Sequence, residues 1–428
     1  MSEGAGRPRF LVSAPSSGAG KTTVTLGLLR ALKRRGVPVS SAKAGPDYID
    51  PAFHAAASGA ECVNLDPFAM RPGLIAGLAP SGPLVVEGMM GLFDGAADGT
   101  GSAAELAALL GLPVVLVVDC ARQSHSVAAL VRGFATHRPD TPLAGLVLNR
   151  VSTLRHEAML RGALEELDLP ILGALPPRPD LALPERHLGL VQAGEHGDLE
   201  AFLERAASWI EAGINLDTLP SGSARPAGDA APLSPLGARI AVARDTAFAF
   251  AYPHLLAGWR NLGAELSFFS PLADEGPDAS ADAVYLPGGY PELHAGRLSG
   301  NAVFRGGMQH AATRGALVYG ECGGYMTLGE TMEDAEGTTH PMLELLPLST
   351  SFRVRNRHLG YRRLRPVGHR PWAGALVGHE FHYATVLHEG AAEPLFEARD
   401  ALGADLGSMG LRVGRVMGSF AHVIDGAS

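Results

Sequence analysis

Short apolar runs alternate with amphipathic helical patterns through the first half of the chain. The run Phe10–Ala14 predicts a strand, and Lys21–Arg34 predicts a helix because apolar side chains recur at helical spacing before a basic end. Further predicted strands are Val37–Ala42, Pro83–Glu87, Pro113–Asp119, Leu143–Asn149 and Ile171–Ala174. These runs are apolar on both faces, as buried parallel strands are. The pattern predicts an α/β fold with a doubly wound parallel sheet and helices on both sides.

A segment rich in Pro, Gly, Ser and Ala, "DTLPSGSARPAGDAAPLSPLG", interrupts this pattern at residues 217–237 and is predicted to be a linker. The pattern then restarts with predicted strands at Arg239–Ala243, Leu266–Phe269, Ala283–Leu286 and Ala316–Tyr319. We therefore expect two α/β domains, residues 1–216 and 238–428. A chain of 428 residues is also too long for one hydrophobic core.

Composition excludes several classes of protein. The chain is 46% hydrophobic and 18% charged, as soluble globular proteins are, and its net charge of −9 gives no support for binding to nucleic acid or to an anionic membrane. Its three cysteines are odd in number and far apart, which argues for a reducing compartment. The sequence has no apolar stretch near the roughly 20 residues that span a bilayer. We expect a cytoplasmic protein.

The segment "APSSGAGKTT" stands between the first predicted strand and helix, the context that makes a phosphate loop credible. Backbone N–H groups would cradle the phosphates, Lys21 would reach the β- and γ-phosphates, and Thr22 would hold Mg²⁺. Pro15 replaces the usual first glycine, so an ordinary Gly-rich turn is the alternative. The positions that fit ATP binding are Gly18, Gly20, Lys21, Thr22 and Thr23.

Carboxylates and a lysine follow the neighbouring strands. The segment "AKAGPDYIDPAFH" carries Lys43, Asp47 and Asp50, and "PLVVEGMMGLFDG" carries Glu87 at its strand end and then Asp94. Carboxyl ends of parallel strands meet at one sheet edge, where such side chains are natural Mg²⁺ ligands. Each acid alone is more often a loop or cap residue, but their joint placement favours a metal and phosphate site.

Asn149 follows another predicted strand in "AGLVLNRVS". It could read a nucleotide base at the same edge, or it could simply form a turn. The sequence leaves both interpretations open.

The second half contains "YGECGGYM", a strand-to-helix elbow in which Cys322 takes the place of a nucleophilic serine. We expect the turn to expose Cys322 above the sheet and the following helix N-terminus to lower the pKa of its thiol. A lone cysteine is usually inert core. Here, however, the upstream "VYLPGGYPELHA" offers backbone N–H groups at Gly289 that, with Gly323, would form an oxyanion hole.

A cysteine nucleophile also needs a base. Among 16 histidines we prefer His422 in "VMGSFAHVI", which follows a β-like run and a small-residue turn. His382 in "GHEFHYAT" is the competitor.

Together these segments resemble those of the cobyrinic acid and hydrogenobyrinic acid a,c-diamide synthase family. The resemblance runs from about residue 8 to about residue 424. The segments that carry it occur in the order "PSSGAGKTT", "KAGPDYIDPAFH", "VEGMMGLFDG", "ERHLGL", "ARDTAFAFAYP", "YLPGGYPELHA", "ECGGYM", "GHEFHY" and "GSFAHV".

The resemblance implies an N-terminal domain similar to dethiobiotin synthetase and a C-terminal class I glutamine amidotransferase domain. ATP would phosphorylate the a and c acetate side chains of cobyrinic or hydrogenobyrinic acid, and ammonia from glutamine would displace phosphate. Partners would thus be small molecules. The sequence leaves the oligomeric state open, and a homodimer is one interpretation.

The same resemblance implies roles for single residues. Cys322 would be the glutaminase nucleophile and His422 its base. Lys43, Asp47, Glu87 and Asp94 would surround the metal, the γ-phosphate and the substrate carboxylate, and Asp50 matches the motif without a clear role.

One position departs from the wider glutaminase pattern. Class I glutaminases usually carry a glutamate two residues after the catalytic histidine, and Ile424 stands there in this chain. Asp425 is adjacent, but its spacing is wrong for that role. The site would then be a Cys–His dyad, and what orients His422 stays open.

Two other interpretations differ in class. Cobyric acid synthases share the two-domain plan, but those chains are longer and their phosphate loop differs. Partition-type ATPases are nucleotide switches that usually carry a second lysine early in the loop, where Pro15–Ser17 stand here, and they lack a glutaminase domain.

Overall fold

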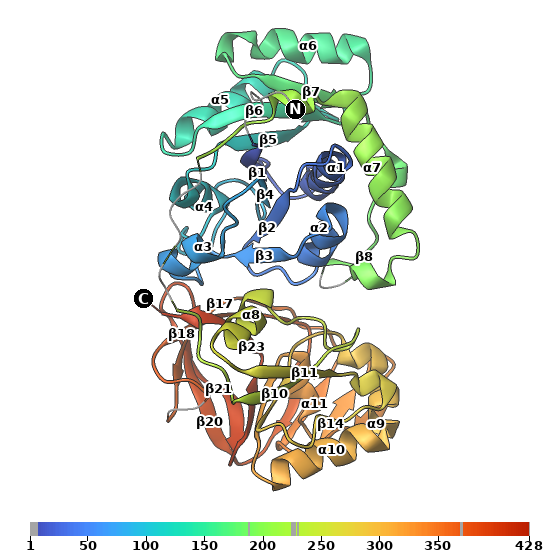
Figure 1. Cartoon of the computed structure of the whole chain (residues 1–428), viewed down its shortest axis with the longest axis vertical. Helices are drawn as coiled ribbons and strands as arrows, with labels where there is room; N and C mark the ends of the chain where they lie inside the picture. Colours follow the sequence, from blue (N-terminus) through green and yellow to red (C-terminus); the bar gives the residue numbers. More distant parts are fainter. Residues whose placement is uncertain (1–6, 187–188, 224–227, 229–230, 369–370, 428) are drawn as a thin grey trace. The chain divides into compact units, whose positions relative to one another are not determined.

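The computed structural model describes residues 7–186, 189–223, 228, 231–368 and 371–427, and this chain divides into two compact units. Unit 1 comprises residues 1–68 and 72–230, and unit 2 comprises residues 69–71 and 231–428. Residues 224–227 and 229–230 of the predicted linker, and 187–188 of the "ERHLGL" segment, lie outside the described residues. Each unit has its own principal sheet (Figure 1).

Within its described residues, unit 1 is built on seven parallel strands in the order β3-β2-β4-β1-β5-β6-β7. Within the sheet, β2 and β4 lie on one side of β1, whereas β5 pairs with β1 on its other side. The loop after β1 therefore lies where the connections diverge, the usual ligand position in open α/β sheets. The strands are β1 (Arg9–Ser13), β2 (Ser40–Ala44), β3 (Cys62–Leu65), β4 (Leu84–Glu87), β5 (Val114–Asp119), β6 (Leu143–Asn149) and β7 (Ile171–Leu175).

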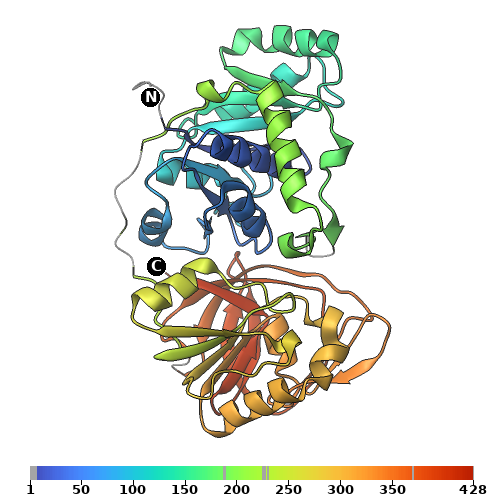
Figure 2. The ribbon, with the colours of Figure 1, turned by 45° about the vertical axis from the view of Figure 1, so that its right-hand side comes forward.

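Helices cover both faces of this sheet, with α1, α2 and α7 along one face and α4 and α5 along the other (Figures 1 and 2). Gly27 lets α1 approach α7 closely, since a Cβ there would lie 2.5 Å from Cγ1 of Ile210. The helices are α1 (Lys21–Arg34), α2 (Asp50–Ser58), α3 (Pro72–Leu78), α4 (Ala103–Leu110), α5 (Val127–His137), α6 (Leu154–Leu164) and α7 (Leu199–Gly213).

The predicted elements of unit 1 are largely observed, with one shifted strand, but β3 and the two-residue strands β8 (Glu185–Arg186) and β9 (Gly189–Leu190) were not predicted. The helix α1 has the predicted bounds. The strand predicted at Val37–Ala42 begins instead at Ser40, because the Val37 N–H donates to Leu32 O and closes the end of α1. The four residues of β3 give too little periodicity for a pattern.

In the described part of unit 2, the main sheet has ten strands in the order β11-β10-β12-β13-β22-β21-β20-β17-β18-β23. The strands from β11 to β22 pair in parallel, and those from β22 to β23 are antiparallel. The main-sheet strands are β10 (Arg239–Ala243), β11 (Glu265–Phe269), β12 (Ala283–Leu286), β13 (Leu317–Glu321), β17 (His358–Pro366), β18 (Leu376–His382), β20 (Glu393–Arg399), β21 (Asp405–Val413), β22 (Val416–Ser419) and β23 (Ala421–Gly426).

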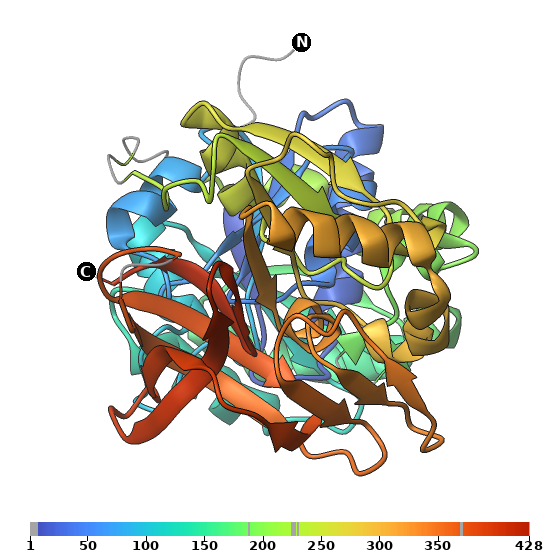
Figure 3. The same cartoon turned by 90° about the horizontal axis from the view of Figure 1, so that it is seen from below.

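A smaller sheet and short helices complete unit 2. Figure 3 shows the antiparallel strands (red) apart from the helices α9 and α10 (orange). The smaller-sheet strands are β14 (Thr331–Glu333), β15 (Thr339–Pro341), β16 (Leu348–Ser351) and β19 (Thr385–Glu389). The helices are α8 (Pro253–Asn261), α9 (Ala295–Gly300), α10 (Ala302–Thr313) and α11 (Gly323–Thr327).

The sequence patterns predicted the parallel part of unit 2 but not its antiparallel part. Strands such as β19 and β21 are half exposed and lack long apolar runs, so their pattern is weak. No helix in the described part of the chain is both long and apolar enough to cross a membrane.

Candidate functional sites in the two units

The phosphate loop joins β1 to α1 in unit 1. Gly18 and Gly20 adopt positive φ angles of 80° and 90°, which side chains rarely tolerate. Gly20 occupies the N-cap of α1 without a side-chain cap, so the first N–H groups of the helix face the loop. The Lys21 ammonium donates to Ser16 O at 3.3 Å, folded over the loop. The geometry is that of an anion-binding turn.

A buried cluster of charges lies at the ends of β2 and β4. Glu87 Oε1 accepts from the Lys43 ammonium and from the Thr22 hydroxyl, each at 2.7 Å. Lys43 also donates to Asp50 at the start of α2. The other Glu87 oxygen, Oε2, lies 2.7 Å from Nε2 of His54. The sheet edge thus brings together Thr22, Lys43, Asp50 and Glu87, which were predicted, and His54, which was not.

His54 had a detectable signal in the sequence. It stands four residues after Asp50 on α2, so both side chains project from one helix face toward the same strands.

The pairing of opposite charges controls ionisation in this cluster. Burial opposes the charged form of Glu87, but Lys43 and His54 outweigh it and hold the pKa of this carboxyl well below its usual range. Burial would likewise lower the pKa of Lys43, yet Asp50 and Glu87 raise it. For His54, contacts with Cys62 and Glu87 overcome burial and raise the pKa to about 10. Lys43, His54 and Glu87 are therefore held charged, whereas burial and Asp47 raise the pKa of Asp50 to about 6.

A cavity of about 650 Å³ opens above the phosphate loop. All the predicted ATP and metal residues line it, namely Gly18, Gly20, Lys21, Thr22, Thr23, Lys43, Asp47, Glu87 and Asn149. Asp50 lies behind Lys43 and is not among the lining residues. Asp94 is exposed, accepts from Gly91 N–H at 2.8 Å, and does not line the cavity either.

Asn149 braces the phosphate loop. Its Nδ2 donates to Ala19 O at 2.9 Å, and its Oδ1 accepts from Arg150 N–H at 2.9 Å. A Cβ on Gly20 would lie only 2.4 Å from this Nδ2. The contact explains why a glycine stands at residue 20, and each polar atom of Asn149 keeps capacity for one further hydrogen bond.

In unit 2, Cys322 forms the elbow between β13 and α11 with φ 48° and ψ −107°. The turn depends on close backbone packing. A Cβ on Gly324 would lie 2.0 Å from Leu286 O at the end of β12. The Cys322 N–H donates to Ser419 O at 2.8 Å, which ties the elbow to the end of β22. The predicted strand-to-helix elbow is present.

The predicted exposure of Cys322 and the predicted lowering of its thiol pKa are both wrong. The residue is 1% exposed. Burial and the nearby Glu292 raise the pKa of the thiol, and the N–H of Gly323 opposes this only in part. A five-residue helix cannot offset the loss of solvent. The raised pKa favours the neutral thiol of Cys322.

His422 lies beside Cys322. A Cβ on Gly288 would lie 2.3 Å from Cε1 and 2.8 Å from Nε2 of His422, and 3.1 Å from Cβ of Cys322. The missing side chain of Gly288 thus leaves space beside both this imidazole edge and the cysteine. Burial, with the nearby His379 and His382, lowers the pKa of His422 to about 3. A neutral imidazole can accept the thiol proton.

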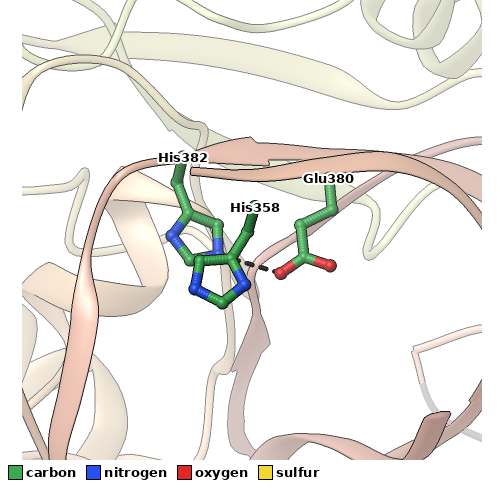
Figure 4. Close-up of side chains that lie close together, drawn as sticks. All are labelled: His358, Glu380 and His382. Carbon is green, nitrogen blue, oxygen red and sulfur yellow. Dashed lines mark hydrogen bonds and ion pairs between the residues drawn. The ribbon is translucent and has the colours of Figure 1, made fainter. Parts of the chain in front are cut away.

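The competitor His382 belongs to a different cluster, drawn in Figure 4 with His358 and Glu380. Its Nε2 lies 2.8 Å from Glu380 Oε1, and its ring stacks on His358 with centroids 4.7 Å apart and on Phe420 at 3.9 Å. The other Glu380 oxygen accepts from Arg362 at 2.7 Å. These contacts engage Nε2 of His382 with Glu380 and both faces of its ring with His358 and Phe420.

The residue types of this cluster could bind a metal ion, with candidate ligand atoms within 4.8 Å of one another. However, the imidazole rings of His358 and His382 stack face to face with an interplanar angle of 11°, rather than converging on one point. Glu380 is also already paired with Arg362. We assign no ion to this cluster.

The predicted oxyanion glycines adjoin the elbow. A Cβ on Gly323 would lie 3.1 Å from the backbone N of Gly289, so the two backbones pass in contact. Gly289 is itself packed against Ala247, because a Cβ there would lie 2.1 Å from Ala247 O. The structure brings both predicted N–H positions to the nucleophile.

Glu321, the residue before Cys322, was missed by the sequence predictions. It is the last residue of β13, is fully buried, and accepts from Tyr285 Oη at 2.7 Å and Tyr319 Oη at 3.0 Å. Its Oε2 lies 3.7 Å from Nδ1 of His422. An acid at the end of an apolar strand, directly before the cysteine, is the signal that could have indicated it.

Asp425 is engaged elsewhere. Its carboxylate accepts from the Arg71 guanidinium at 2.8 and 2.9 Å and from the Arg71 N–H at 3.0 Å. The sequence indicated that Asp425 stands at the wrong spacing to orient His422. In the structure Asp425 is paired with Arg71 instead.

Comparisons with known proteins agree with this two-site arrangement. Residues 10–191 match the family described as the CobQ/CobB/MinD/ParA nucleotide binding domain, and residues 239–427 match the CobB/CobQ-like glutamine amidotransferase domain. The chain is 64% identical over 427 residues to a hydrogenobyrinate a,c-diamide synthase of Brucella anthropi, covering 97% of this chain and 98% of that protein. It is 61% identical over 423 residues to the protein of the same name from Rhizobium meliloti, covering 97% and 99%. The match to a solved glutamine amidotransferase structure spans 44% of this chain and 90% of that protein, with 18% identity and a TM-score of 0.31.

Proposed function

The chain belongs to the hydrogenobyrinate a,c-diamide synthase family, and on this premise we propose that it amidates the a and c acetate side chains of hydrogenobyrinic or cobyrinic acid. It is a ligase of cobalamin biosynthesis that uses a nucleotide and takes nitrogen from glutamine. The observation that carries the proposal is the presence in one chain of a phosphate loop with a charged cluster and of a buried Cys–His pair.

The nucleotide is needed because a carboxylate does not acylate ammonia, since its leaving group would be oxide. Transfer of the γ-phosphoryl group of ATP to the carboxylate gives an acyl phosphate. Attack by ammonia then forms the C–N bond and releases phosphate. Each amidation consumes one ATP and one glutamine.

We propose that the phosphate loop of unit 1 binds ATP. Gly18, Gly20 and Thr23 contribute backbone and hydroxyl groups, and Lys21 swings from Ser16 O onto the β- and γ-phosphates. Lys43, which is held charged by Glu87, stabilises the transferring phosphoryl group.

Hard oxygen donors at the same edge fit Mg²⁺. The Thr22 hydroxyl and the Glu87 carboxylate already meet at 2.7 Å, and Asp47 lines the same cavity. Mg²⁺ bound by Thr22, Asp47 and Glu87 would neutralise phosphate charge. Asp50 keeps Lys43 in place, whereas Asp94 reaches the substrate carboxylate only if its loop closes on the bound substrate. Asn149 contacts the nucleotide from the loop it braces.

The chemistry proposed for unit 2 is the hydrolysis of glutamine. His422 takes the proton of the Cys322 thiol, and the thiolate attacks the amide carbon of glutamine. The N–H groups of Gly289 and Gly323 stabilise the oxyanion. The C–N bond then breaks, the imidazolium returns its proton to the leaving nitrogen, and water hydrolyses the thioester to glutamate.

Three coarser features belong to the same proposal. Residues 1–216 would form the synthetase domain and residues 238–428 the amidotransferase domain, joined by 217–237. The free, buried cysteines Cys62, Cys120 and Cys322 support a reducing compartment, the cytoplasm. The protein would act on small molecules as a homodimer without nucleic acid.

The test is a defined reaction with ATP, Mg²⁺, glutamine and either corrinoid, followed by mass spectrometry. We expect the diamide, with amide nitrogen derived from amide-labelled glutamine and no product after chelation of Mg²⁺. Formation of ADP without amide would favour a nucleotide switch. Amidation of the diamide rather than of the free acid would favour a cobyric acid synthase. Competition between the two corrinoids identifies the preferred ring.

A further inference from the structure

The catalytic histidine of unit 2 lacks the acid that usually orients it. The position two residues after His422 is Ile424, and Asp425 is held by Arg71. Yet an imidazole that must take a proton on one nitrogen needs the other nitrogen fixed, because its two neutral tautomers are close in energy.

Glu321 is a buried acid that the glutaminase chemistry described above does not use. Its Oε1 accepts from Tyr319 Oη at 3.0 Å and from the Val423 N–H at 2.9 Å, and its Oε2 accepts from Tyr285 Oη at 2.7 Å. These donors come from β12, β13 and β23, so the carboxylate is fixed from several strands at once. The Oε2 atom, bonded to Tyr285, retains a second lone pair.

This oxygen faces the histidine. Oε2 lies 3.7 Å from Nδ1 of His422, whereas Nε2 of the same ring lies on the side of Gly288 and Cys322. Glu321 thus approaches one nitrogen of His422, and the other nitrogen lies on the side of Cys322. Adjacent residues of a strand normally point to opposite faces, but the positive φ of 48° at Cys322 turns the backbone so that both side chains approach His422.

We propose that Glu321 is the positioning residue of the glutaminase site, accepting the Nδ1–H of His422 and so leaving Nε2 to take the thiol proton of Cys322. This inference rests on the proposed roles of Cys322 and His422. The acid of the triad thus comes from the residue before the nucleophile instead of the second residue after the base.

The observed separation is slightly longer than a hydrogen bond. A distance of 3.7 Å closes by a movement of less than about 1 Å, as catalytic hydrogen bonds do when substrate binds. Burial raises the pKa of Glu321 to about 7, against the opposing effect of its hydrogen-bond donors. The imidazolium that forms when the thiol loses its proton would stabilise the carboxylate form.

The other nearby acids do not compete. Glu380 is paired with Arg362 and His382, and Asp425 is paired with Arg71. Both nevertheless provide comparisons for a test, because each is a buried carboxylate of unit 2.

The experiment measures glutamine-dependent and ammonia-dependent amidation of the corrinoid in full-length variants. We expect Glu321→Gln to lower kcat with glutamine by roughly 10²-fold at unchanged KM for glutamine, and to leave the ammonia-dependent rate unchanged. Glu321→Asp should recover part of the loss. Asp425→Asn, the matched control, should leave kcat with glutamine within about twofold.

The outcomes separate this inference from its premise. If His422→Asn keeps full activity with glutamine, the proposed role of His422 is wrong. If His422→Asn loses that activity but Glu321→Gln retains it, only the role of Glu321 is wrong. A raised KM with unchanged kcat in Glu321→Gln would also overturn the inference, because it would indicate substrate binding.

If Glu321→Gln also loses ammonia-dependent activity, the fold is damaged and a second variant decides. Tyr285→Phe/Tyr319→Phe keeps the aromatic packing and removes the hydroxyls that hold Glu321. We expect it to lower kcat with glutamine about tenfold at unchanged KM. An unchanged kcat in this double variant would overturn the inference.

Discussion

The two chemical sites of this chain are equally buried and yet have opposite electrostatics. In unit 1, Lys43 and Glu87 are both buried, and each pKa is shifted so that the group stays charged. In unit 2, Cys322 and His422 are also buried, and each pKa is shifted so that the group stays neutral. Burial disfavours charge in both places, so burial cannot explain the difference.

The difference comes from the partners. Lys43 has two carboxylates within contact distance, and the Coulomb attraction outweighs the lost solvation. Acids near Cys322 oppose formation of its thiolate, and burial with His379 and His382 outweighs the opposing effect of Glu380 on His422, so both groups stay neutral. Phosphoryl transfer requires permanent charges, whereas a thiol attack requires a proton that can move. Buried groups are therefore kept charged in unit 1 and neutral in unit 2.

The largest effect is expected at Cys322, where a substitution should distinguish the chemistry of unit 2 from that of unit 1. Cys322→Ser should reduce glutamine-dependent amidation by at least roughly 10³-fold, because the hydroxyl is a far weaker nucleophile, and should leave the rate with high ammonia intact. Product formation with each nitrogen source checks this. Equal loss with both sources would mean that the substitution disturbs more than the glutaminase site.

The reverse effect is expected at Glu87. Glu87→Gln should lower amidation about 10²-fold with either nitrogen source and destabilise unit 1 by about 3 kcal/mol, because it leaves Lys43 poorly compensated. Glutamine hydrolysis should persist. Product assays and urea unfolding measure the two effects. The exposed Asp94, substituted by Asn, is the control for stability, and normal product formation by Glu87→Gln would contradict the assigned site.

A smaller effect is expected from filling the space between the catalytic pair. Gly288→Ala would place a methyl group 2.3 Å from His422 Cε1, and we expect kcat with glutamine to fall about tenfold or more while the ammonia-dependent rate persists. Gly306→Ala on α10 adds the same methyl group where nothing lies within 4 Å and should have no effect. Equal kinetics for both variants would show that Gly288 does not set this geometry.

The smallest effect concerns the neutral histidines of unit 2. Burial, with Arg362, lowers the pKa of His379 to about 3. Below pH 6.5 the unfolded chain binds a proton at this residue and the native state does not, so stability falls as the pH decreases from about 6.5 toward 3. At pH 5 the loss is about 2 kcal/mol for this histidine.

Substituting His379 tests the direction of this pH dependence of stability. His379→Gln should melt with a smaller decrease in Tm between pH 7 and pH 5 than the unsubstituted protein, while the exposed His388→Gln should not differ from it. An equal decrease in Tm in all three proteins would show that residues other than His379 cause the loss of stability in acid.

Local sequence patterns predicted what local physics controls. The helix Lys21–Arg34 follows from apolar spacing after a glycine-rich turn, and the buried parallel strands follow from continuous apolar runs. The antiparallel strands of unit 2 escaped prediction because their faces are partly exposed and their partners are distant in sequence. His54 and Glu321 escaped for a related reason. Each has a local signal, but the partners that it meets, Glu87 for His54 and His422 for Glu321, are distant in the sequence.

The sequence by itself determined the two α/β domains, the phosphate loop, the cysteine elbow and the family, because these depend on residues that are neighbours along the chain. Only the tertiary structure decided which groups are charged. The ion pairs of Glu87, the neutral thiol of Cys322 and the approach of Glu321 to His422 depend on distances between separate strands and on the exclusion of water. Those distances arise when the sheets form, and no single segment carries them.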